Sequence, residues 1–443
     1  MPEFPAEKAA KRAPIESSGS PSSDELPSGS PSSGESSSVS KMHPTVKALG
    51  WVSLFSDLAS KMVYPITPFF LTVVLGAPAW TVGVIEGIAE STAGLLKLYS
   101  GWLSDRAGQR KPFAVAGYGL GAMSKLGLAI ASSWGTVLGA RLLDRVGKGL
   151  RAAPRDALIA DNCAPEQRGQ AYGLHHSLET IGEVVGPLLG FAFLWQFANN
   201  YRGVFGLAFV PALIGVFVLL KGVKEKSVKE NDNNETHKAS GNRAAPKFTF
   251  RRLSPTYQRY LGIITLFGLG NSSDAFLLLR AQDLGASGLE LMLLYASFNL
   301  VSVALAITIG RASDRVGRRP LLMAGYGLFS LVYLGFAIAY SSALVWILFL
   351  FYGLYGALTR GVQKALVADL VHPQRKGAEI GTFHMLSGLV ALPASLFAGF
   401  LYTNVSAGAP FYFSAGMGVI ATGLLWQLRL PQVSGKTTSN AKN

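Results

Sequence analysis

Pairs of carboxyl side chains lie inside long apolar stretches of this sequence. Glu86 and Glu90 are four residues apart, and so are Glu179 and Glu183, so each pair would share one face of a helix. Two carboxylates held together in an apolar environment repel each other, and one of them can then carry a proton near neutral pH. A group that changes its charge near neutral pH is what a proton-coupled process requires.

Asp57 and Arg145 are expected at the same depth in the apolar layer as Glu90 and Glu183. Each lies roughly 11 to 14 residues from one end of its stretch, or about 15 to 20 Å at the helical rise of about 1.5 Å per residue. Buried charges at one level are costly, so an arginine there needs acidic partners. Asp57 could instead form a structural ion pair with Lys61. The candidates for proton coupling are Asp57, Glu86, Glu90, Arg145, Glu179 and Glu183.

His175 and His176 precede Glu179, and His175 would share its helix face. Adjacent histidines on a helix point in different directions, so this grouping favours a pH-sensitive pair over a metal site. The single cysteine, Cys163, excludes a disulfide within the chain and a cysteine-rich metal site. We expect neither a metal nor a cofactor.

The second half of the chain has fewer ionisable residues in its apolar stretches. We therefore expect proton chemistry in the first half and mainly apolar binding of a substrate in the second. The candidates for the substrate cavity are Asp274, Phe298, Tyr355 and His384.

The elements that carry these residues are predicted to cross a membrane. Of the 443 residues, 49% are hydrophobic and 15% charged, whereas charged residues make up about a quarter of a soluble domain. Apolar runs of roughly 20 residues can cross a hydrocarbon core of about 30 Å. The predicted helices cover 46–75, 80–103, 113–132, 136–157, 169–196 and 204–221, and six more begin near residues 260, 289, 321, 344, 377 and 411.

Polar segments separate and flank these helices. Residues 1–42 are rich in Ser, Pro and Gly and are predicted to form a disordered cytoplasmic tail. Residues 43–221 would form one six-helix bundle and residues 259–430 a second. A cytoplasmic linker is expected at 222–258 and a short cytoplasmic tail at 431–443.

The net charge of +14 indicates an orientation rather than a nucleic-acid partner. Basic residues are concentrated in the linker and in the short loops on its side, such as the one containing Arg110 and Lys111. The opposite loops carry almost none. By the positive-inside rule, both termini and the linker are expected in the cytoplasm.

The two halves of the chain repeat each other. SDRAGQRKP, starting at Ser104, is similar to SDRVGRRP, starting at Ser313, and AGYGL occurs at both Ala116 and Ala324. Asp105 and Asp314 are 209 residues apart, and Gly169 and Gly377 are 208 apart. Two halves related in this way are typical of transporters that bind substrate at the interface between the halves.

The charged loop resembles the signature loop of the major facilitator superfamily, and a weaker second copy is also typical of that family. The resemblance runs from about Val46 to Leu430. It implies that Asp105 and Arg106 stabilise the state closed to the cytoplasm by charge pairing. The residues of this gating loop and its copy are Gly101, Asp105, Arg106, Gly108, Arg110, Lys111, Asp314, Arg315, Gly317 and Arg318.

Two further motifs resemble those of drug:proton antiporters in that superfamily. The first consists of Gly173, Gly182, Gly186, Pro187 and Gly190. The same glycines could simply allow another helix to approach closely, and Pro187 could supply a bend. The second motif, Arg145-x-x-Lys148-Gly149-x-x-Ala152, resembles the one whose arginine is linked to proton transfer.

These observations predict an all-α polytopic protein of the inner (plasma) membrane, with twelve transmembrane helices in two six-helix pseudo-repeats. We expect a monomer in the lipid bilayer that exports a small organic molecule or drug against inward proton flow by alternating access. The alternatives are a proton-coupled importer or a metal or siderophore carrier of the same fold, and, in another class, a membrane receptor or scaffold. No enzymatic motif is present in the sequence, and no nucleic-acid partner is expected.

Overall fold

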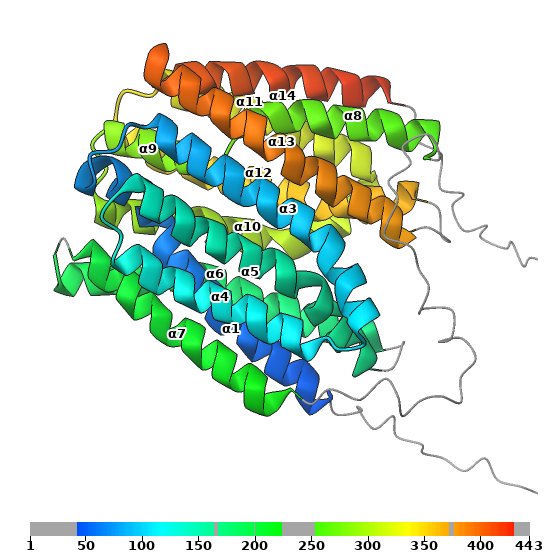
Figure 1. The fold of residues 1–443 in the computed structure, drawn as a ribbon. Coiled ribbons are helices and arrows are strands. Elements are labelled where there is room, and N and C mark those ends of the chain that lie inside the picture. Colours follow the sequence, from blue (N-terminus) through cyan, green and yellow to red (C-terminus); the bar gives the residue numbers. More distant parts are fainter. Residues whose placement is uncertain (1–41, 164–166, 199, 224–252, 372–375, 429–443) are drawn as a thin grey trace, which may run out of the picture. The chain divides into compact units, whose positions relative to one another are not determined.

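The computed structural model describes residues 42–163, 167–198, 200–223, 253–371 and 376–428. These residues are helical apart from short connections (Figure 1). The predicted tails and most of the predicted linker lie outside the described residues. The backbone of Asp105 is described, but its side chain is not.

The first half of the chain begins with α1 (Pro44–Val63), which continues through three short turns: η1 (Tyr64–Ile66), α2 (Thr67–Phe69) and η2 (Phe70–Val74). Its other helices are α3 (Trp80–Ala107), α4 (Lys111–Ala129), α5 (Trp134–Asp161), α6 (Arg168–Gln196) and α7 (Tyr201–Gly222). The second half contains α8 (Pro255–Gly270), α9 (Ala275–Asp283), α10 (Gly288–Val316), α11 (Arg318–Ile338), α12 (Ser342–Leu370), α13 (Lys376–Asn404) and α14 (Ala409–Gln427).

The first helix of each half is interrupted. Prolines at positions 65 and 68 remove backbone donors, and the regular helix of α1 gives way to the short turns that follow it. In the second half, α8 ends at Gly270 and α9 starts at Ala275, with Asp274 in the cap position. Discontinuous helices at corresponding positions of two repeats are a common mark of a transporter's binding site.

The two interruptions meet at the interface between the halves. The Tyr64 hydroxyl hydrogen-bonds to that of Ser273 at 3.1 Å, and these residues are 209 positions apart. Nearby, the Thr72 hydroxyl and the Gln282 side chain hydrogen-bond at 3.2 Å across a separation of 210. Residues at corresponding positions of the two repeats therefore contact each other. This is expected where residues lie next to the pseudo-twofold axis that relates two similar halves.

Long helices join the halves on either side of this axis. α3 packs along α13, as Figure 1 also shows, and α6 packs against α10. Glycines permit the first contact, because a Cβ atom added to Gly94 would lie 2.8 Å from the Cα of Gly388. The Ser91 hydroxyl also donates a 2.7 Å hydrogen bond to the Gly388 carbonyl.

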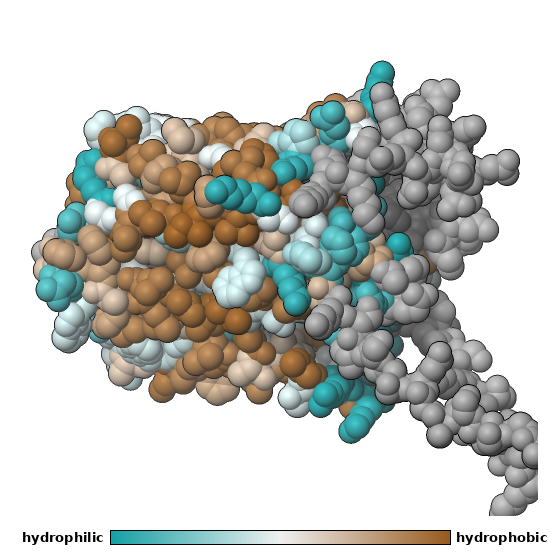
Figure 2. Space-filling view, turned by 90° about the horizontal axis from the view of Figure 1, so that it is seen from below, coloured by the Kyte–Doolittle hydropathy of each residue, from teal (hydrophilic) through white to brown (hydrophobic). Residues whose placement is uncertain are grey.

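The outer surface suits a lipid environment. Figure 2 shows hydrophobic residues across the middle of the visible face and hydrophilic residues towards its ends. Large apolar side chains such as Trp51, Phe217 and Leu350 are exposed. Eight of the described helices are long and apolar enough to cross a membrane, and α1, α3 and α5, which carry charged residues, are not among them. The fold is thus that of an all-helical polytopic membrane protein.

Candidate functional site

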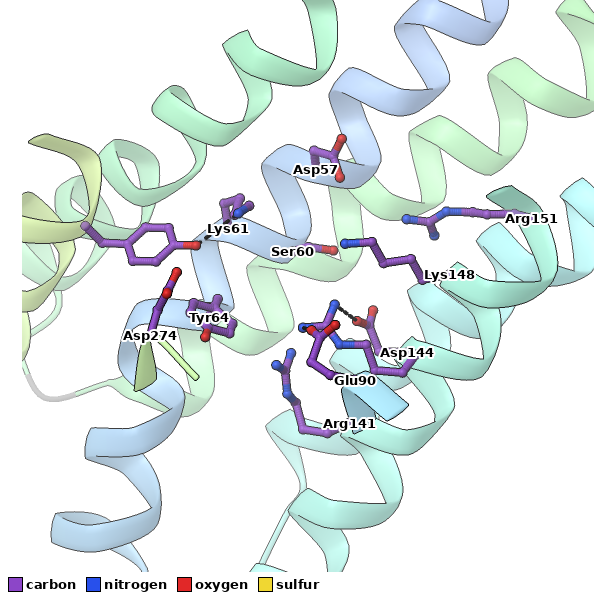
Figure 3. Close-up of a pocket in the computed structure, with 12 residues that line it drawn as sticks. Asp57, Ser60, Lys61, Tyr64, Glu90, Arg141, Asp144, Lys148, Arg151 and Asp274 are labelled. Atoms are coloured by element: carbon purple, nitrogen blue, oxygen red, sulfur yellow. Dashed lines mark hydrogen bonds and ion pairs between the residues drawn. The ribbon is translucent and has the colours of Figure 1, made fainter. Parts of the chain in front are cut away.

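A cavity of about 140 Å³ lies where the two halves meet. Nine of its twelve lining residues are charged, and the other three are Ser and Tyr (Figure 3). The lining residues are Asp57, Ser60, Lys61, Tyr64, Glu90, Arg141, Asp144, Arg145, Lys148, Arg151, Asp274 and Tyr295. This cavity is hydrophilic, unlike the mainly apolar pocket that we expected from the second half.

The first half supplies most of the lining. On α5, the charged residues recur every three or four positions, from Arg141 to Arg151, so they form one stripe along the helix. α1 contributes Asp57, Ser60 and Lys61 to the cavity. The second half contributes only Asp274 and Tyr295 to the described lining. The expected difference between the halves is therefore visible at this site.

Glu90 and Arg145 form an ion pair in the cavity. Their side chains approach to 2.7 Å, and the Arg145 guanidinium also lies 3.8 Å from Asp144. The Glu90 side chain is 44% exposed, whereas Arg145 is buried. Among the described residues, the Nε of Arg145 has no hydrogen-bond partner. From its depth, Arg145 was predicted only to need an acidic partner; the structure pairs it with Glu90, whose carboxylate stays accessible from the cavity.

Glu86 is also paired, but it is enclosed. Arg141 donates hydrogen bonds of 2.6 and 3.1 Å to Oε1 of Glu86, and both side chains are only 4% exposed. The Arg141 guanidinium lies over the Tyr64 ring, 5.3 Å from its centre. Glu86 and Glu90 thus have separate arginine partners instead of facing each other as unpartnered like charges.

Lys125 and Asp144 form a further buried ion pair, at 2.5 Å, between α4 and α5. The Lys125 ammonium also donates a 3.2 Å hydrogen bond to the Ser60 hydroxyl on α1. Sequence reasoning did not foresee this pair. The only available signal was that two opposite charges occur in adjacent apolar stretches.

Lys61 pairs with Glu183 and not with Asp57. Its ammonium lies 3.2 Å from Glu183 on α6 and donates a 2.9 Å hydrogen bond to the Tyr295 hydroxyl on α10. The i,i+4 pair Asp57–Lys61 that we considered is therefore absent from the ion pairs of the described residues. Lys61 therefore links Glu183 of its own half to Tyr295 of the opposite half.

Asp57, Lys148 and Arg151 face the same cavity without forming an ion pair with any described residue. Asp57 is close enough to Lys148 and Arg151, and to Glu179 and Glu183 on α6, to interact with them electrostatically. The Arg151 guanidinium stacks on the Tyr118 ring, 4.3 Å from its centre. These three charged groups of the first half are therefore the ones at the site whose charge no described residue neutralises in an ion pair.

Glu179 lies outside the described lining of the cavity. It accepts a 2.7 Å hydrogen bond from Arg155 on α5. His175 and His176 are each 3.7 Å from its other carboxylate oxygen, so the predicted shared face of His175 and Glu179 is observed. Within the described part of the chain, no group of three His, Cys, Asp or Glu residues could hold a metal ion.

The charged loop and its copy make equivalent contacts. Arg110 pairs with Asp161, and Arg318 pairs with Asp369 at 2.5 Å; each pair spans 51 residues. Arg318 also pairs with Asp314 at 3.1 Å. Each loop is therefore tied to the end of the fourth helix of its own half.

Backbone geometry explains the glycines of the two loops. Gly108 and Gly317 have positive φ angles of 64° and 98°, which favour glycine at these tight turns. The predicted role of Asp105 in gating concerns a side chain outside the described part of the structure, so that role remains a prediction.

The glycines of the predicted antiporter motif bring α6 close to α1. A Cβ atom on Gly182 would lie 2.7 Å from the Leu54 carbonyl oxygen, and one on Gly186 would lie 2.6 Å from that of Leu58. Gly190 approaches the side chain of Met292 on α10. Gly173 has open space around its Cα, and Pro187 lies inside α6. The motif residues from 182 to 190 therefore act in helix packing.

Of the predicted substrate-cavity residues, Asp274 lines the cavity and accepts a 2.5 Å hydrogen bond from the Tyr352 hydroxyl. Phe298 and Tyr355 are buried in an aromatic cluster of the second half, where both contact Tyr352. His384 is exposed and packs against Phe383. These last three predicted residues are not part of the described lining.

Comparison with known proteins gives a consistent family match. The family model described as Major Facilitator Superfamily matches residues 49–279 and 260–442. An uncharacterized MFS-type transporter of Methanocaldococcus jannaschii is 33% identical over 400 residues, covering 87% of this chain and 94% of that protein. The multidrug resistance protein MdtH of Aeromonas hydrophila is 32% identical over 173 residues, covering 39% of this chain and 43% of that protein. A solved POT family transporter in complex with 5-aminolevulinic acid has a TM-score of 0.71 at 12% identity, covering 87% of this chain and 96% of the other.

Proposed function

Because the chain belongs to the Major Facilitator Superfamily, a family of membrane transporters and not of enzymes, we propose that it is a proton-coupled carrier of a small charged organic molecule. The observation that supports this proposal is the cavity between the halves, which is lined by charged, Ser and Tyr side chains. A lipophilic drug would need apolar walls, whereas a charged solute can exchange its hydration shell for these groups.

Carboxylates at the cavity support the coupling to protons. Asp57 faces the cavity without a described ion-pair partner, and Glu90 is half exposed beside Arg145. Protonating Glu90 would release the Arg145 guanidinium, and a released arginine could find new partners when the halves move. The pair is thus the point at which proton binding would change the balance between two conformations.

The direction of transport depends on the charge of the substrate. A cationic substrate would compete with a proton for a carboxylate such as Asp57, which favours exchange and hence export. An anionic substrate would bind more strongly once that carboxylate is neutral, which favours movement of proton and substrate together. The resemblance of the α6 glycines to the antiporter motif and the partial match to MdtH favour exchange, whereas the two lining cations without a described ion pair, Lys148 and Arg151, favour an anion and hence movement of proton and substrate together.

The proposal can be tested in proteoliposomes that contain the full chain. Uptake of small organic anions and cations would be compared with and without an imposed pH gradient. Asp57→Asn and Glu90→Gln should abolish accumulation against a substrate gradient but spare one-for-one exchange, because exchange needs no net proton movement. Asp156→Asn, at a half-exposed carboxylate of α5 outside the described lining, is a matched control and should accumulate substrate normally.

Normal accumulation by Asp57→Asn, Glu90→Gln and Glu183→Gln alike would show that these carboxylates are structural and that the coupling proposal is wrong. Loss of both accumulation and exchange in a variant would indicate damage to substrate binding. The exchange assay separates that result from a loss of coupling.

A further inference from the structure

We propose that the substrate is a small organic anion with a carboxylate or phosphate group, and that Lys148 and Arg151 of α5 bind that group. This inference rests on the proposed function, because it concerns the ligand of the same cavity. It follows from which charges of the site are already paired within the protein and which are not.

Most charges at the cavity neutralise each other. Four acidic side chains around it each have a basic partner within 3.2 Å, and the pairs are Glu86–Arg141, Glu90–Arg145, Asp144–Lys125 and Glu183–Lys61. Asp274 accepts a hydrogen bond from Tyr352. Among the described lining residues, the charged groups without an ion pair are Lys148 and Arg151 on one side and Asp57 and Asp274 on the other. Asp274 belongs to the second half and is engaged by Tyr352, so on the first half Lys148 and Arg151 face Asp57 alone.

Arg151 is the more informative of the two cations. It is 6% exposed, and stacking on Tyr118 covers one face of its guanidinium. Its N–H groups form no hydrogen bond with any residue in the described ranges, although a guanidinium carries five donors. A guanidinium at the cavity whose donors are not taken up by described residues can bind an acceptor that a ligand supplies.

Lys148 and Arg151 can act on one ligand. They are three residues apart on one helix and therefore project from the same face. Figure 3 shows both side chains extending from α5 into the space below Asp57. An arginine fork beside a lysine suits an oxyanion, because the fork can donate two parallel hydrogen bonds while the ammonium adds charge.

Further cations lie on the linker side of the cavity. Lys97 lies on α3, and Arg360 and Lys364 lie on α12, each towards the end of its helix on that side. None of the three forms an ion pair with a residue that the structure describes. Lys97 and Lys364 come from opposite halves and are close enough to interact electrostatically. Carboxylates lie among them, since Glu183 is close enough to Arg360 to interact with it.

The test measures the preference of the cavity for charge without knowledge of the natural substrate. In a Cys163→Ser background the chain has no other cysteine, and Ser60→Cys then places a single thiol at the cavity. The purified full chain would be treated with two thiol reagents of similar size, an anionic sulfonatoethyl methanethiosulfonate and its cationic trimethylammonium counterpart. The rate at which each reagent modifies the protein would be divided by its rate with a free thiol in solution.

We expect the normalised rate of the anionic reagent to exceed that of the cationic reagent by on the order of tenfold. Lys148→Gln and Arg151→Gln should each remove most of this preference. Arg202→Gln, which removes a cation that bonds to the Ala129 carbonyl in an exposed region, should not change it. Equal rates, or a preference for the cationic reagent, would overturn the proposal, as would an anion preference that survives both α5 substitutions.

Protection experiments distinguish a carboxylate ligand from a phosphate ester. Slower modification in the presence of succinate would assign the site to carboxylates, and slower modification with glycerol 3-phosphate would assign it to phosphate esters. Protection by tetraethylammonium alone would contradict the proposal. Because no pH gradient is present in these measurements, an anion preference can be found even if proton-coupled transport fails, and the reverse also holds.

Discussion

At the scale of single residues, two glutamates with the same helical spacing have different surroundings. Glu86 is enclosed with Arg141, and both side chains are 4% exposed, whereas the Glu90 carboxylate opens to the cavity. A buried ion pair that loses one member leaves the other charge without compensation. The first glutamate is therefore expected to support the fold, and the second is the one that we propose to exchange protons.

Glu86→Gln should lower the free energy of unfolding by about 3 to 5 kcal/mol, since it leaves the Arg141 guanidinium buried without a counter-charge. Glu90→Gln should cost less, because its carboxylate is partly solvated and Asp144, 3.8 Å away, still faces the Arg145 guanidinium. Thermal unfolding of the purified chain in detergent measures both. Combining Glu86→Gln with Arg141→Gln should recover part of the loss. Equal stability of wild type and Glu86→Gln would show that this pair does not support the fold.

The sequence located the buried charges better than it located their partners. The i,i+4 rule correctly places His175 and Glu179 on one face, because both lie on the same helix. It did not predict that Lys61 pairs with Glu183, since that contact depends on how α1 and α6 are rotated against each other. Packing of side chains between helices sets such rotations, and a single sequence does not reveal it.

At the scale of helices, glycine spacing on α6 determines how closely it approaches α1. Gly182 and Gly186 have α1 backbone atoms within 3 Å of where a Cβ atom would lie, whereas Gly173 has no neighbour at that position. The predicted motif therefore contains residues of two kinds. At Gly182 and Gly186, the close backbone of α1 leaves no room for a side chain. Gly173 has no such neighbour, so a side chain would fit there.

Gly186→Ala should impair folding or transport, because the added methyl group would lie 2.6 Å from the Leu58 carbonyl oxygen and the helices would have to separate. We expect a loss of about 1 to 3 kcal/mol in stability. Gly173→Ala is the matched control on the same helix and should be neutral or slightly stabilising, because alanine favours helix more than glycine does. Unfolding midpoints and yields of folded protein would measure both, and equal behaviour of the two variants would contradict this packing role.

The helices themselves were largely predictable from hydrophobic runs and polar loops. The start predicted for the second helix, at Trp80, is the observed start of α3. The predicted run that begins near residue 260 contains the charged residue Asp274. In the structure the chain leaves the helix after Gly270 and restarts at Ala275, which brings Asp274 to the cavity. A charge inside an apolar run thus coincides with a break in the helix.

At the scale of the whole molecule, the described contacts between the halves close the cavity on one side. Tyr64–Ser273 and Thr72–Gln282 lie on the side of the loop that follows Val74. From the positive-inside rule we predict that this loop lies outside the cell and the linker in the cytoplasm. With that orientation, we expect the proposed substrate site to face the cytoplasm in this structure.

The orientation can be tested with reporter fusions to the full chain. A reporter inserted in the linker near residue 235 should be active in the cytoplasm, and one inserted in the loop at residues 76–79 should be active outside. Alkaline phosphatase and a fluorescent protein report opposite sides, so each fusion checks the other. Both insertions on one side of the membrane would contradict the topology.

The contact between Gly94 and Gly388 has a mechanical consequence. On α3 and α13 these residues meet backbone to backbone, and the closely approaching positions Gly83 and Gly87 lie between there and Trp80. Neither residue has a side chain that could interlock with the other helix, so the hydrogen bond from the Ser91 hydroxyl to the Gly388 carbonyl is the polar contact that a rolling motion there would strain. Such a contact can serve as a fulcrum, and the distance from it to each end of the helix pair is a lever arm. A displacement of atomic size beside the fulcrum, such as the breaking of the Glu90–Arg145 pair one helical turn away, would then be amplified at the far ends of the helices.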